Sequence, residues 1–187
     1  MPRTQVLTLI AGAVLASTVM WPSRVAVRAD DDHDRDHNKM FSARLRSFSE
    51  VPSISSTGQG TFRARLSPDG TSLHYKLTYS GLTAPVTQSH IHFGERHTGG
   101  GIMVWLCSGP TNVDPTGLAP ACVSEGSVEG DIRAANILQP GAPPPSAGQG
   151  IAAGEFEEFL RALREGAGYA NVHSTAFPGG EIRGQVQ

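Results

Sequence analysis

Residues 61–79 read TFRARLSPDGTSLHYKLTY and alternate apolar with polar side chains on both sides of a short turn. Alternation with a period of two is the pattern of a half-buried β-strand. In the turn, Pro68 fixes φ and Gly70 supplies a positive φ. The sequence therefore predicts a β-hairpin with strands at 61–66 and 72–79 and an antiparallel sheet around it.

Six more segments have strand character and are separated by turns rich in glycine and proline. They lie at residues 41–48, 87–93, 101–106, 127–132, 168–173 and 180–186. In residues 155–165, by contrast, Phe156, Phe159, Leu160 and Leu163 recur with helical spacing. We predict a mainly β fold, an antiparallel Greek-key sandwich or barrel, with one crossover α-helix over about 155–165.

Residues 1–29 have the composition of a secretory signal peptide. A basic start is followed by an apolar run from Val6 to Trp21, and Val27 and Ala29 stand before the expected cleavage site. The run of about 16 residues is short of the roughly 20 that a spanning helix needs. We predict cleavage after Ala29 and a secreted domain, extracellular or periplasmic, without a membrane span. An uncleaved membrane anchor is the alternative.

Residues 30–39 read DDDHDRDHNK and contain no apolar side chain to bury. We expect this acidic, histidine-containing leader to be disordered, as a solvated spacer or as a collector of divalent metal ions. Residues 40–187 are long enough for one domain with a core. Without residues 1–29, the chain has 12 Lys and Arg against 17 Asp and Glu, a net charge of −5. That charge argues against nucleic acid as a partner.

The two cysteines of the chain are Cys107 and Cys122. In an oxidising compartment a pair of cysteines is usually a disulfide. The segment between them is rich in Pro, Gly, Asn, Asp and Thr, so a bridge would restrain a long loop. We predict this disulfide. The alternative, two metal-binding thiolates, fits no zinc spacing.

Histidines supply the candidate binding site. His90 and His92 flank one apolar residue in the strand predicted at 87–93, so their side chains share a face. His173 ends another predicted strand and adds a third imidazole. Three neutral imidazoles suit Cu, Zn, Ni or Fe(II). We predict a metal site of these three residues, with His97 of the following glycine-rich loop as a secondary candidate. Hydrogen-bonded framework histidines without a metal are the alternative.

No motif of a catalytic centre accompanies these histidines. The sequence contains no nucleophile elbow, P-loop or dinucleotide fingerprint, and no Ser/His/Asp order stands out. We therefore assign no catalytic residue and favour a role other than that of an enzyme.

Six short motifs follow one another along the chain. They are FSARL at 41–45, SEVP at 49–52, GQG at 58–60, HIHFG at 90–94, YANVH at 169–173 and PGGEIRGQ at 178–185. As a set they resemble the chordin-type (CHRD) domain family over residues 40–187. The resemblance implies a secreted, mostly β domain and assigns it no activity. Growth-factor binding by chordin belongs to cysteine-rich modules that this chain lacks.

The HIHFG motif, the later cysteine and the pair Val172-His173 are also similar to the copper-ligand motifs of copper-zinc superoxide dismutases, which are Greek-key barrels. That similarity implies copper ligation by His90, His92 and His173 and a bridging role for His97. The further zinc ligands and the arginine-bearing active-site loop of the dismutases have no counterpart here. The similarity therefore implies a shared barrel and a mononuclear copper site rather than dismutase activity.

Three functions follow from these observations. The first is an exported binding module with a copper-type or zinc site, whose partner is that metal or an unidentified protein. The second, equally supported, is a metal-free structural or interaction domain of the cell envelope or extracellular space. A copper redox enzyme of the superoxide dismutase type ranks third.

Overall fold

The computed structural model describes residues 39–141 and 148–187. The predicted signal peptide at 1–29 lies outside the described residues. So does the predicted leader at 30–39, apart from Lys39, which forms a turn before the first strand. Both remain predictions.

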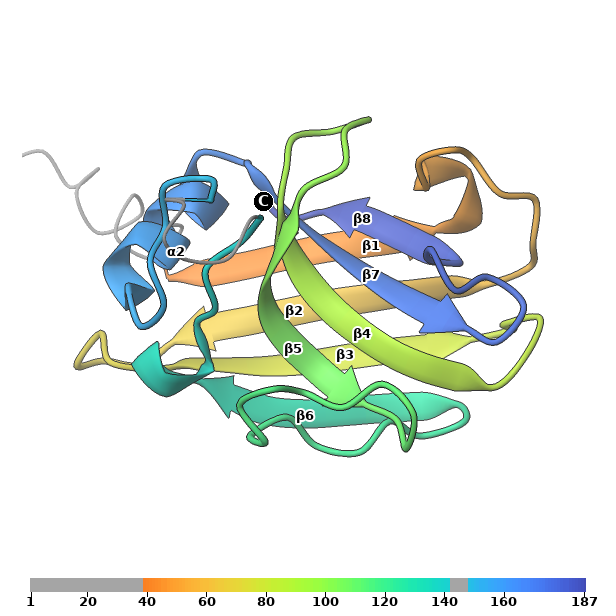
Figure 1. The fold of residues 1–187 in the computed structure, drawn as a ribbon, viewed down its shortest axis with the longest axis horizontal. Coiled ribbons are helices and arrows are strands. Elements are labelled where there is room, and N and C mark those ends of the chain that lie inside the picture. Colours follow the sequence, from red (N-terminus) through yellow and green to blue (C-terminus); the bar gives the residue numbers. More distant parts are fainter. Residues whose placement is uncertain (1–38, 142–147) are drawn as a thin grey trace, which may run out of the picture.

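Eight antiparallel strands form one sheet that curls into a nearly closed barrel (Figure 1). They are β1 (Met40–Arg46), β2 (Gln59–Leu66), β3 (Leu73–Ser80), β4 (Val86–Phe93), β5 (Gly101–Ser108), β6 (Gly126–Ile132), β7 (Gly168–Ser174) and β8 (Ile182–Gln185). The strand order across the sheet is β5-β4-β7-β8-β1-β2-β3-β6. Because β6 pairs with β3 and β7 pairs with β4, the connections are of the Greek-key type. The predicted fold class is confirmed.

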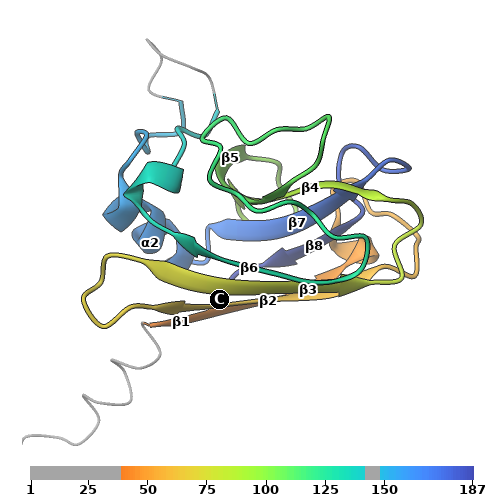
Figure 2. The ribbon, with the colours of Figure 1, turned by 90° about the horizontal axis from the view of Figure 1, so that it is seen from below.

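Two layers of strands enclose the core (Figure 2). One layer contains β1, β2, β3 and β6, and the other contains β4, β5, β7 and β8. Alternate residues of each strand point inward, so β1 has a strict exposed-buried pattern along its length. Side chains from both layers meet in the interior, among them Leu45, Phe62, Leu77, Ile91 and Val172.

The hairpin predicted from residues 61–79 is present as β2 and β3. Its turn is closed by hydrogen bonds between Ser67 and Ser72, and Gly70 has a φ of 75°. Positive φ is the conformation that glycine adopts without a steric penalty. The turn chemistry and the period of two together explain why this pairing could be predicted.

Side chains and a disulfide close the barrel between its two edge strands, β5 and β6. The Tyr75 hydroxyl of β3 crosses the interior and donates to the Leu106 carbonyl of β5 at 2.6 Å. The predicted disulfide between Cys107 and Cys122 is confirmed and ties β5 to the segment that leads into β6. These links replace the ladder of backbone hydrogen bonds that joins the other strands.

Among residues 39–141 and 148–187 there is one α-helix, α2 (Phe156–Arg164), which precedes β7 and lies at one end of the barrel (Figure 1). Phe159, Leu160 and Leu163 are almost fully buried, as their helical spacing predicts. Two short 3-10 helices, η1 (Ser47–Ser49) and η2 (Ala134–Asn136), follow β1 and β6. In the part of the chain described, no helix has the length and apolar character needed to cross a bilayer.

Candidate metal centre

The three predicted ligand histidines come together on two neighbouring strands. His90 and His92 lie on β4, and His173 lies on the adjacent antiparallel strand β7. Ile91, between the first two, points into the core and is fully buried. Because side chains alternate along a strand, His90 and His92 project from the outer face of the barrel wall.

The histidines are covered although they lie on the outer face. His90 is 1% exposed and His173 is 6% exposed. His92 is only partly buried as a residue, but its Nε2 atom is shielded from solvent. The site is therefore a largely dry pocket in the barrel wall rather than a row of surface imidazoles.

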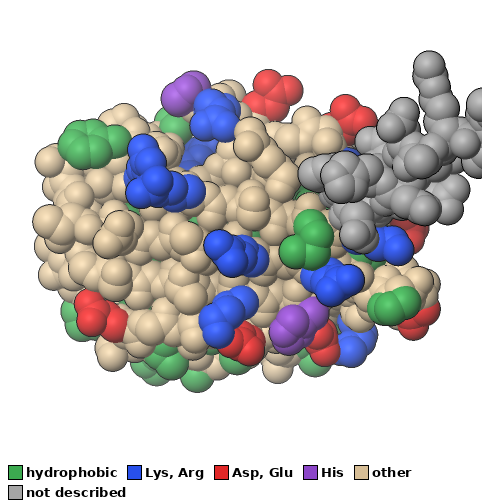
Figure 3. Space-filling view, turned by 180° about the vertical axis from the view of Figure 1, so that it is seen from behind, with side chains coloured by type: hydrophobic (Ala, Val, Ile, Leu, Met, Phe, Trp, Pro, Cys, Tyr) green, Lys and Arg blue, Asp and Glu red, His purple; other side chains and the backbone are tan. Residues whose placement is uncertain are grey.

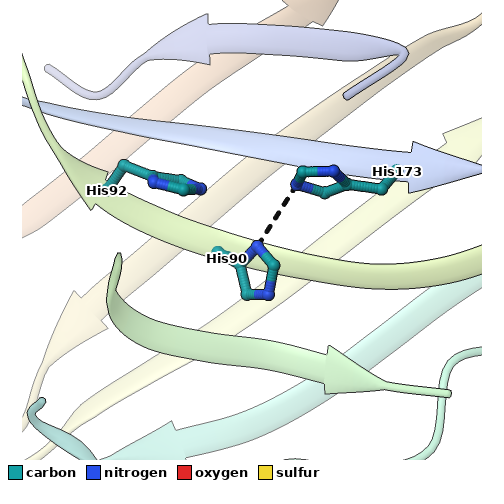
Figure 4. Close-up of side chains that lie close together, drawn as sticks. All are labelled: His90, His92 and His173. Atoms are coloured by element: carbon teal, nitrogen blue, oxygen red, sulfur yellow. Dashed lines mark hydrogen bonds between the residues drawn. The ribbon is translucent and has the colours of Figure 1, made fainter. Parts of the chain in front are cut away.

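The three rings are close enough to share one ligand ion. They turn toward one another, and the Nδ1 atom of His90 lies 3.2 Å from the Nε2 atom of His173 (Figure 4). One nitrogen from each of the three residues lies within 4.8 Å of the other two. Metal–imidazole bonds are about 2.0–2.1 Å, so two ligand nitrogens of one ion lie at most about 4.2 Å apart. Side-chain adjustments of less than about 1 Å would meet that limit.

Backbone carbonyl groups orient two of the rings. The Nδ1–H group of His92 donates to the Gly100 carbonyl at 2.9 Å, and the Nδ1–H group of His173 donates to the Pro178 carbonyl at 2.8 Å. Each bond leaves a lone pair on Nε2 in the neutral ring. Metal-ligating histidines usually have their second nitrogen bonded in this way, which fixes the tautomer and the ring orientation.

Aromatic side chains pack against the same rings. The His92 ring stacks on Tyr169 with 4.8 Å between centroids, and the Arg183 guanidinium lies 3.3 Å from the centroid of that tyrosine ring. The His90 ring meets Trp105 of β5 edge-to-face at 4.2 Å. This packing limits rotation of His90 and His92, so the site is largely formed in advance.

Burial keeps the imidazoles neutral. Desolvation lowers the pKa of His90 far below its usual range, and the neighbouring imidazoles lower it further. Desolvation also lowers the pKa of His92 to about 4 and lowers the pKa of His173, although the bond to the Pro178 carbonyl opposes the latter shift. Neutral imidazoles have free lone pairs, so proton competition for these nitrogens is weak near pH 7.

Two buried nitrogen atoms have no partner. Among residues 39–141 and 148–187, the Nε2 atoms of His90 and His92 make no hydrogen bond. A buried polar atom without a partner costs stability, and a bound ion is one explanation for its presence. Nε2 of His92, Nε2 of His173 and Nδ1 of His90 form a donor set that fits a transition metal ion, which would replace the hydrogen bond between His90 and His173.

The secondary candidate His97 is not brought to this cluster. It lies in the exposed loop between β4 and β5 and has a φ of 67°, in the left-handed region. The described groups of potential ligands include His90, His92 and His173 but not His97. A role for His97 in metal binding stays a prediction.

The groups that surround the histidines were not predicted from the sequence. Tyr169, Asn171 and His173 share one face of β7, and this period of two was the available signal. The Gly100 and Pro178 carbonyl groups could not be identified from the sequence, because they belong to loops that approach the histidines only in the folded structure.

A buried carboxyl group, Glu50, lies beside Asn171. A side chain added at Gly180 would meet both residues, which places their polar ends close together. Desolvation raises the pKa of Glu50 to about 7, and hydrogen bonding to Val51 and the charge of Arg183 oppose the shift.

Acid should destabilise the barrel through the buried histidines. In the unfolded chain they take up protons below about pH 6.5, whereas in the folded protein their lowered pKa values prevent this. The unfolded state then binds more protons, so the free energy of unfolding should be flat above pH 7 and fall as the pH drops from 6.5 toward 4. Each proton difference contributes about 1.4 kcal/mol per pH unit. Urea unfolding at pH 7.5, 6.0 and 5.0 measures this decline.

Glu50 supplies the control, because its contribution has the opposite sign. Its raised pKa means that the folded state binds the extra proton between about pH 4.5 and 7, which favours folding as the pH falls. In the Glu50→Gln variant the decline between pH 7 and 5 should therefore be steeper. A flat stability profile in both proteins would contradict the assignment of neutral, buried histidines.

Comparison with known protein families gives a match that spans the domain. A family model described as the CHRD domain matches residues 41–186. No curated protein and no solved structure matches the chain. The matched range includes all eight strands and the three clustered histidines.

Proposed function

The chain belongs to the CHRD domain family, and from this premise we propose that it is an exported binding module that holds one copper-type ion at His90, His92 and His173. Membership supports the general role of a binding or structural module. The disulfide between Cys107 and Cys122 supports an oxidising environment and hence export.

The observation that carries the proposal is the convergence of three neutral imidazoles on one point. One nitrogen from each lies within 4.8 Å of the others, and two rings are held by backbone carbonyl groups. The Nε2 atom of His92 is buried and makes no hydrogen bond in the described residues, which leaves its lone pair for an ion.

The donor set favours copper or zinc over harder cations. Imidazole nitrogen suits Cu, Zn, Ni and Fe, whereas Mg and Ca prefer oxygen ligands. Copper binds more tightly than zinc to a given nitrogen site. His90, His92 and His173 would hold the ion, and an ion held by three protein ligands can keep a further position for water or an exogenous ligand.

Metal titration tests the proposal. We expect the domain of residues 40–187, which lacks the acidic, histidine-containing leader, to bind one equivalent of Cu(II) and, more weakly, one of Zn(II) in calorimetric titration near pH 7. The His90→Ala/His92→Ala double variant should lose this binding. Unchanged affinity in the double variant would refute the site.

A metal-free structural domain is the second candidate. The hydrogen bond of 3.2 Å between His90 and His173 favours it, since that bond satisfies one nitrogen of each ring without an ion. This candidate predicts no stoichiometric metal in the purified protein and no saturable titration. Replacing the histidines would then change stability alone.

A further inference from the structure

A hollow on the outer face of the barrel has no part in the histidine site. It is open to solvent, has a volume of about 910 Å³ and lies across β1, β2, β3 and the start of β6. Figure 3 looks onto this face, where Lys and Arg side chains gather beside a broad area that is largely free of acidic and apolar side chains. Pockets for small ligands measure about 300–1,000 Å³, so the hollow is large enough for a ligand.

The register of the sheet builds the floor of the hollow from short polar side chains. Arg44 of β1 lies opposite Thr61 of β2. Thr78 of β3 lies opposite Thr61 on one side and Ser127 of β6 on the other. With about 4.8 Å between neighbouring strands, this line of one guanidinium and three hydroxyl groups spans about 14 Å. Because the three hydroxyl side chains are short, the space above them stays open.

The hollow offers many hydrogen-bonding groups that the protein itself does not use. Beside the first line of residues, Gln59 of β2 lies opposite Ser80 of β3. In the part of the chain described, the side chains of Gln59, Ser80 and Ser127 make no hydrogen bond to protein, and the hydroxyls of Thr61 and Thr78 bond each other at 2.6 Å. A hydroxyl group both donates and accepts, so this floor complements the hydroxyl groups of a sugar.

Four exposed arginines extend from the edge of the hollow along β1 and β2. We call them the arginine row: Arg44, Arg46, Arg63 and Arg65. Strand β1 runs antiparallel to β2, with Met40 opposite Arg65. Arg65 and Arg63 therefore occupy one half of the strand pair, and Arg44 and Arg46 occupy the other half. At about 3.4 Å per residue, one guanidinium group follows another about every 7 Å over about 20 Å.

The arginine row lacks counter-charges. Two other cations of the same face are paired, Lys76 with Glu129 and Arg133 with Asp131. Within the described ranges 39–141 and 148–187, none of the four arginines of the row forms an ion pair. Their spacing is below the Debye length of about 8 Å at physiological salt, so they repel one another and favour a partner that carries several negative charges.

A carboxylate marks the opposite end of the hollow. Glu125, which precedes β6, lines that end and accepts a hydrogen bond from the Gly81 backbone at 3.1 Å. Negative groups of a ligand are therefore attracted to the side of Arg44 and repelled from the side of Glu125. Neutral hydroxyl groups can lie on either side.

We propose that this face binds a linear acidic polysaccharide whose sugar units carry carboxylates, a polyuronate. Its carboxylates lie along the arginine row, where planar guanidinium groups can bind them with two hydrogen bonds each. The hydroxyl groups of the units beside Arg44 enter the hollow and bond to its short polar side chains. A polyuronate combines negative charge with many hydroxyl groups, and this face offers complementary groups for both. The proposal does not depend on the metal site.

The side chains of the face favour a polysaccharide over other polyanions. Surfaces that bind single-stranded nucleic acid add aromatic side chains on which the bases stack. No Phe, Tyr or Trp is exposed on β1, β2, β3 or β6, and the formal net charge of the chain is −2. Anionic lipid headgroups could pair with the arginines, but they would leave the hydroxyl-lined hollow unused.

Binding of a labelled oligosaccharide tests the charged part of the proposal. The probe is a fluorescein-labelled oligogalacturonate, and fluorescence anisotropy measures its binding to the full chain at low and at physiological salt. We expect saturable binding that weakens as salt is added. Arg44→Gln/Arg46→Gln should weaken it about tenfold, the loss expected from two surface charge pairs. Arg161→Gln/Arg164→Gln removes the same charge from α2 and should bind the probe like the wild type.

A variant of the hollow tests the contribution of the sugar hydroxyls. Ser127→Ile fills part of the hollow without changing the charge, and a β-branched side chain suits a strand. It should weaken binding of the oligogalacturonate about fivefold, through lost hydrogen bonds, and leave binding of a labelled oligoaspartate peptide unchanged. The methyl-esterified probe keeps its hydroxyls but loses its charges, so it should bind more weakly than the acid. Urea unfolding confirms that each variant is folded.

Four results would overturn the proposal. The first is the absence of saturable binding of the oligogalacturonate. The second is an equal loss in the Arg44→Gln/Arg46→Gln and Arg161→Gln/Arg164→Gln variants. The third is unchanged oligogalacturonate binding in Ser127→Ile, which would indicate a face for any polyanion. The fourth is tighter binding of single-stranded DNA or of phosphatidylserine vesicles than of the oligogalacturonate, which would assign the face to a different partner.

Discussion

Replacing His173 with alanine should weaken Cu(II) binding by more than about a hundredfold, because loss of a group that merely supports a ligand costs 10–100-fold. His173 is the one ligand candidate that β7 contributes, and its Nε2 atom lies 3.2 Å from His90. Without it, two imidazoles of a single strand remain. Calorimetry gives the affinity, and the electron paramagnetic resonance spectrum of Cu(II) should report one nitrogen ligand fewer.

Matched histidine variants make this result specific. His97→Ala removes a histidine from the exposed loop after β4, and His74→Ala removes one from the outer face of β3. Neither residue belongs to the cluster, so both variants should keep the wild-type affinity. If His97→Ala lowers the affinity as much as His173→Ala, the ligand set proposed here is wrong.

Removing the disulfide should have the largest effect on stability. We expect Cys107→Ala/Cys122→Ala to lower the free energy of unfolding by about 3 kcal/mol, the chain-entropy value for a closed loop of this size. The bridge spans a sequence separation of 15. Alanine is preferred to serine at position 107 because that side chain is fully buried. Urea unfolding with and without a reductant measures the loss.

Hydrogen bonds to Asp114 also restrain the loop between Cys107 and Cys122. The loss of stability on removing the disulfide therefore depends on how far these hydrogen bonds order the loop by themselves. The Asp114 carboxylate accepts hydrogen bonds from the backbone of Thr116, Leu118 and Ala119. Asp114→Ala in the background without the disulfide should lower stability further. A loss below about 1 kcal/mol on removing the disulfide alone would mean that these hydrogen bonds already order the loop and that the entropy model overstates the bridge.

The fold could be predicted because its signals are local. The period of two in residues 61–79 and the helical spacing from Phe156 to Leu163 each depend on neighbours in the sequence. The pair His90 and His92 could be assigned to one face for the same reason. The pairing of β4 with β7 joins residues that are distant in the sequence. It could still be suggested, because three histidines at strand positions can share one metal site only if their strands are neighbours.

The rest of the site could not be predicted because it depends on distant contacts. Trp105 reaches His90 through the pairing of β4 with β5, and Arg183 reaches Tyr169 through the pairing of β7 with β8. Alternating arginines on β1 and β2 are visible in the sequence. Only the register, with Met40 opposite Arg65, converts them into one line.

The way the barrel closes has a consequence for how copies of the protein behave together. Unpaired strand edges are templates for pairing with another chain, and proteins usually protect them. Here β5 and β6, the two ends of the sheet, lie next to each other and are joined by the disulfide and by the Tyr75 hydroxyl. Each edge shields the other. Reduction of the disulfide would loosen both edges at once, so the tendency to aggregate by strand exchange should rise in a reducing environment.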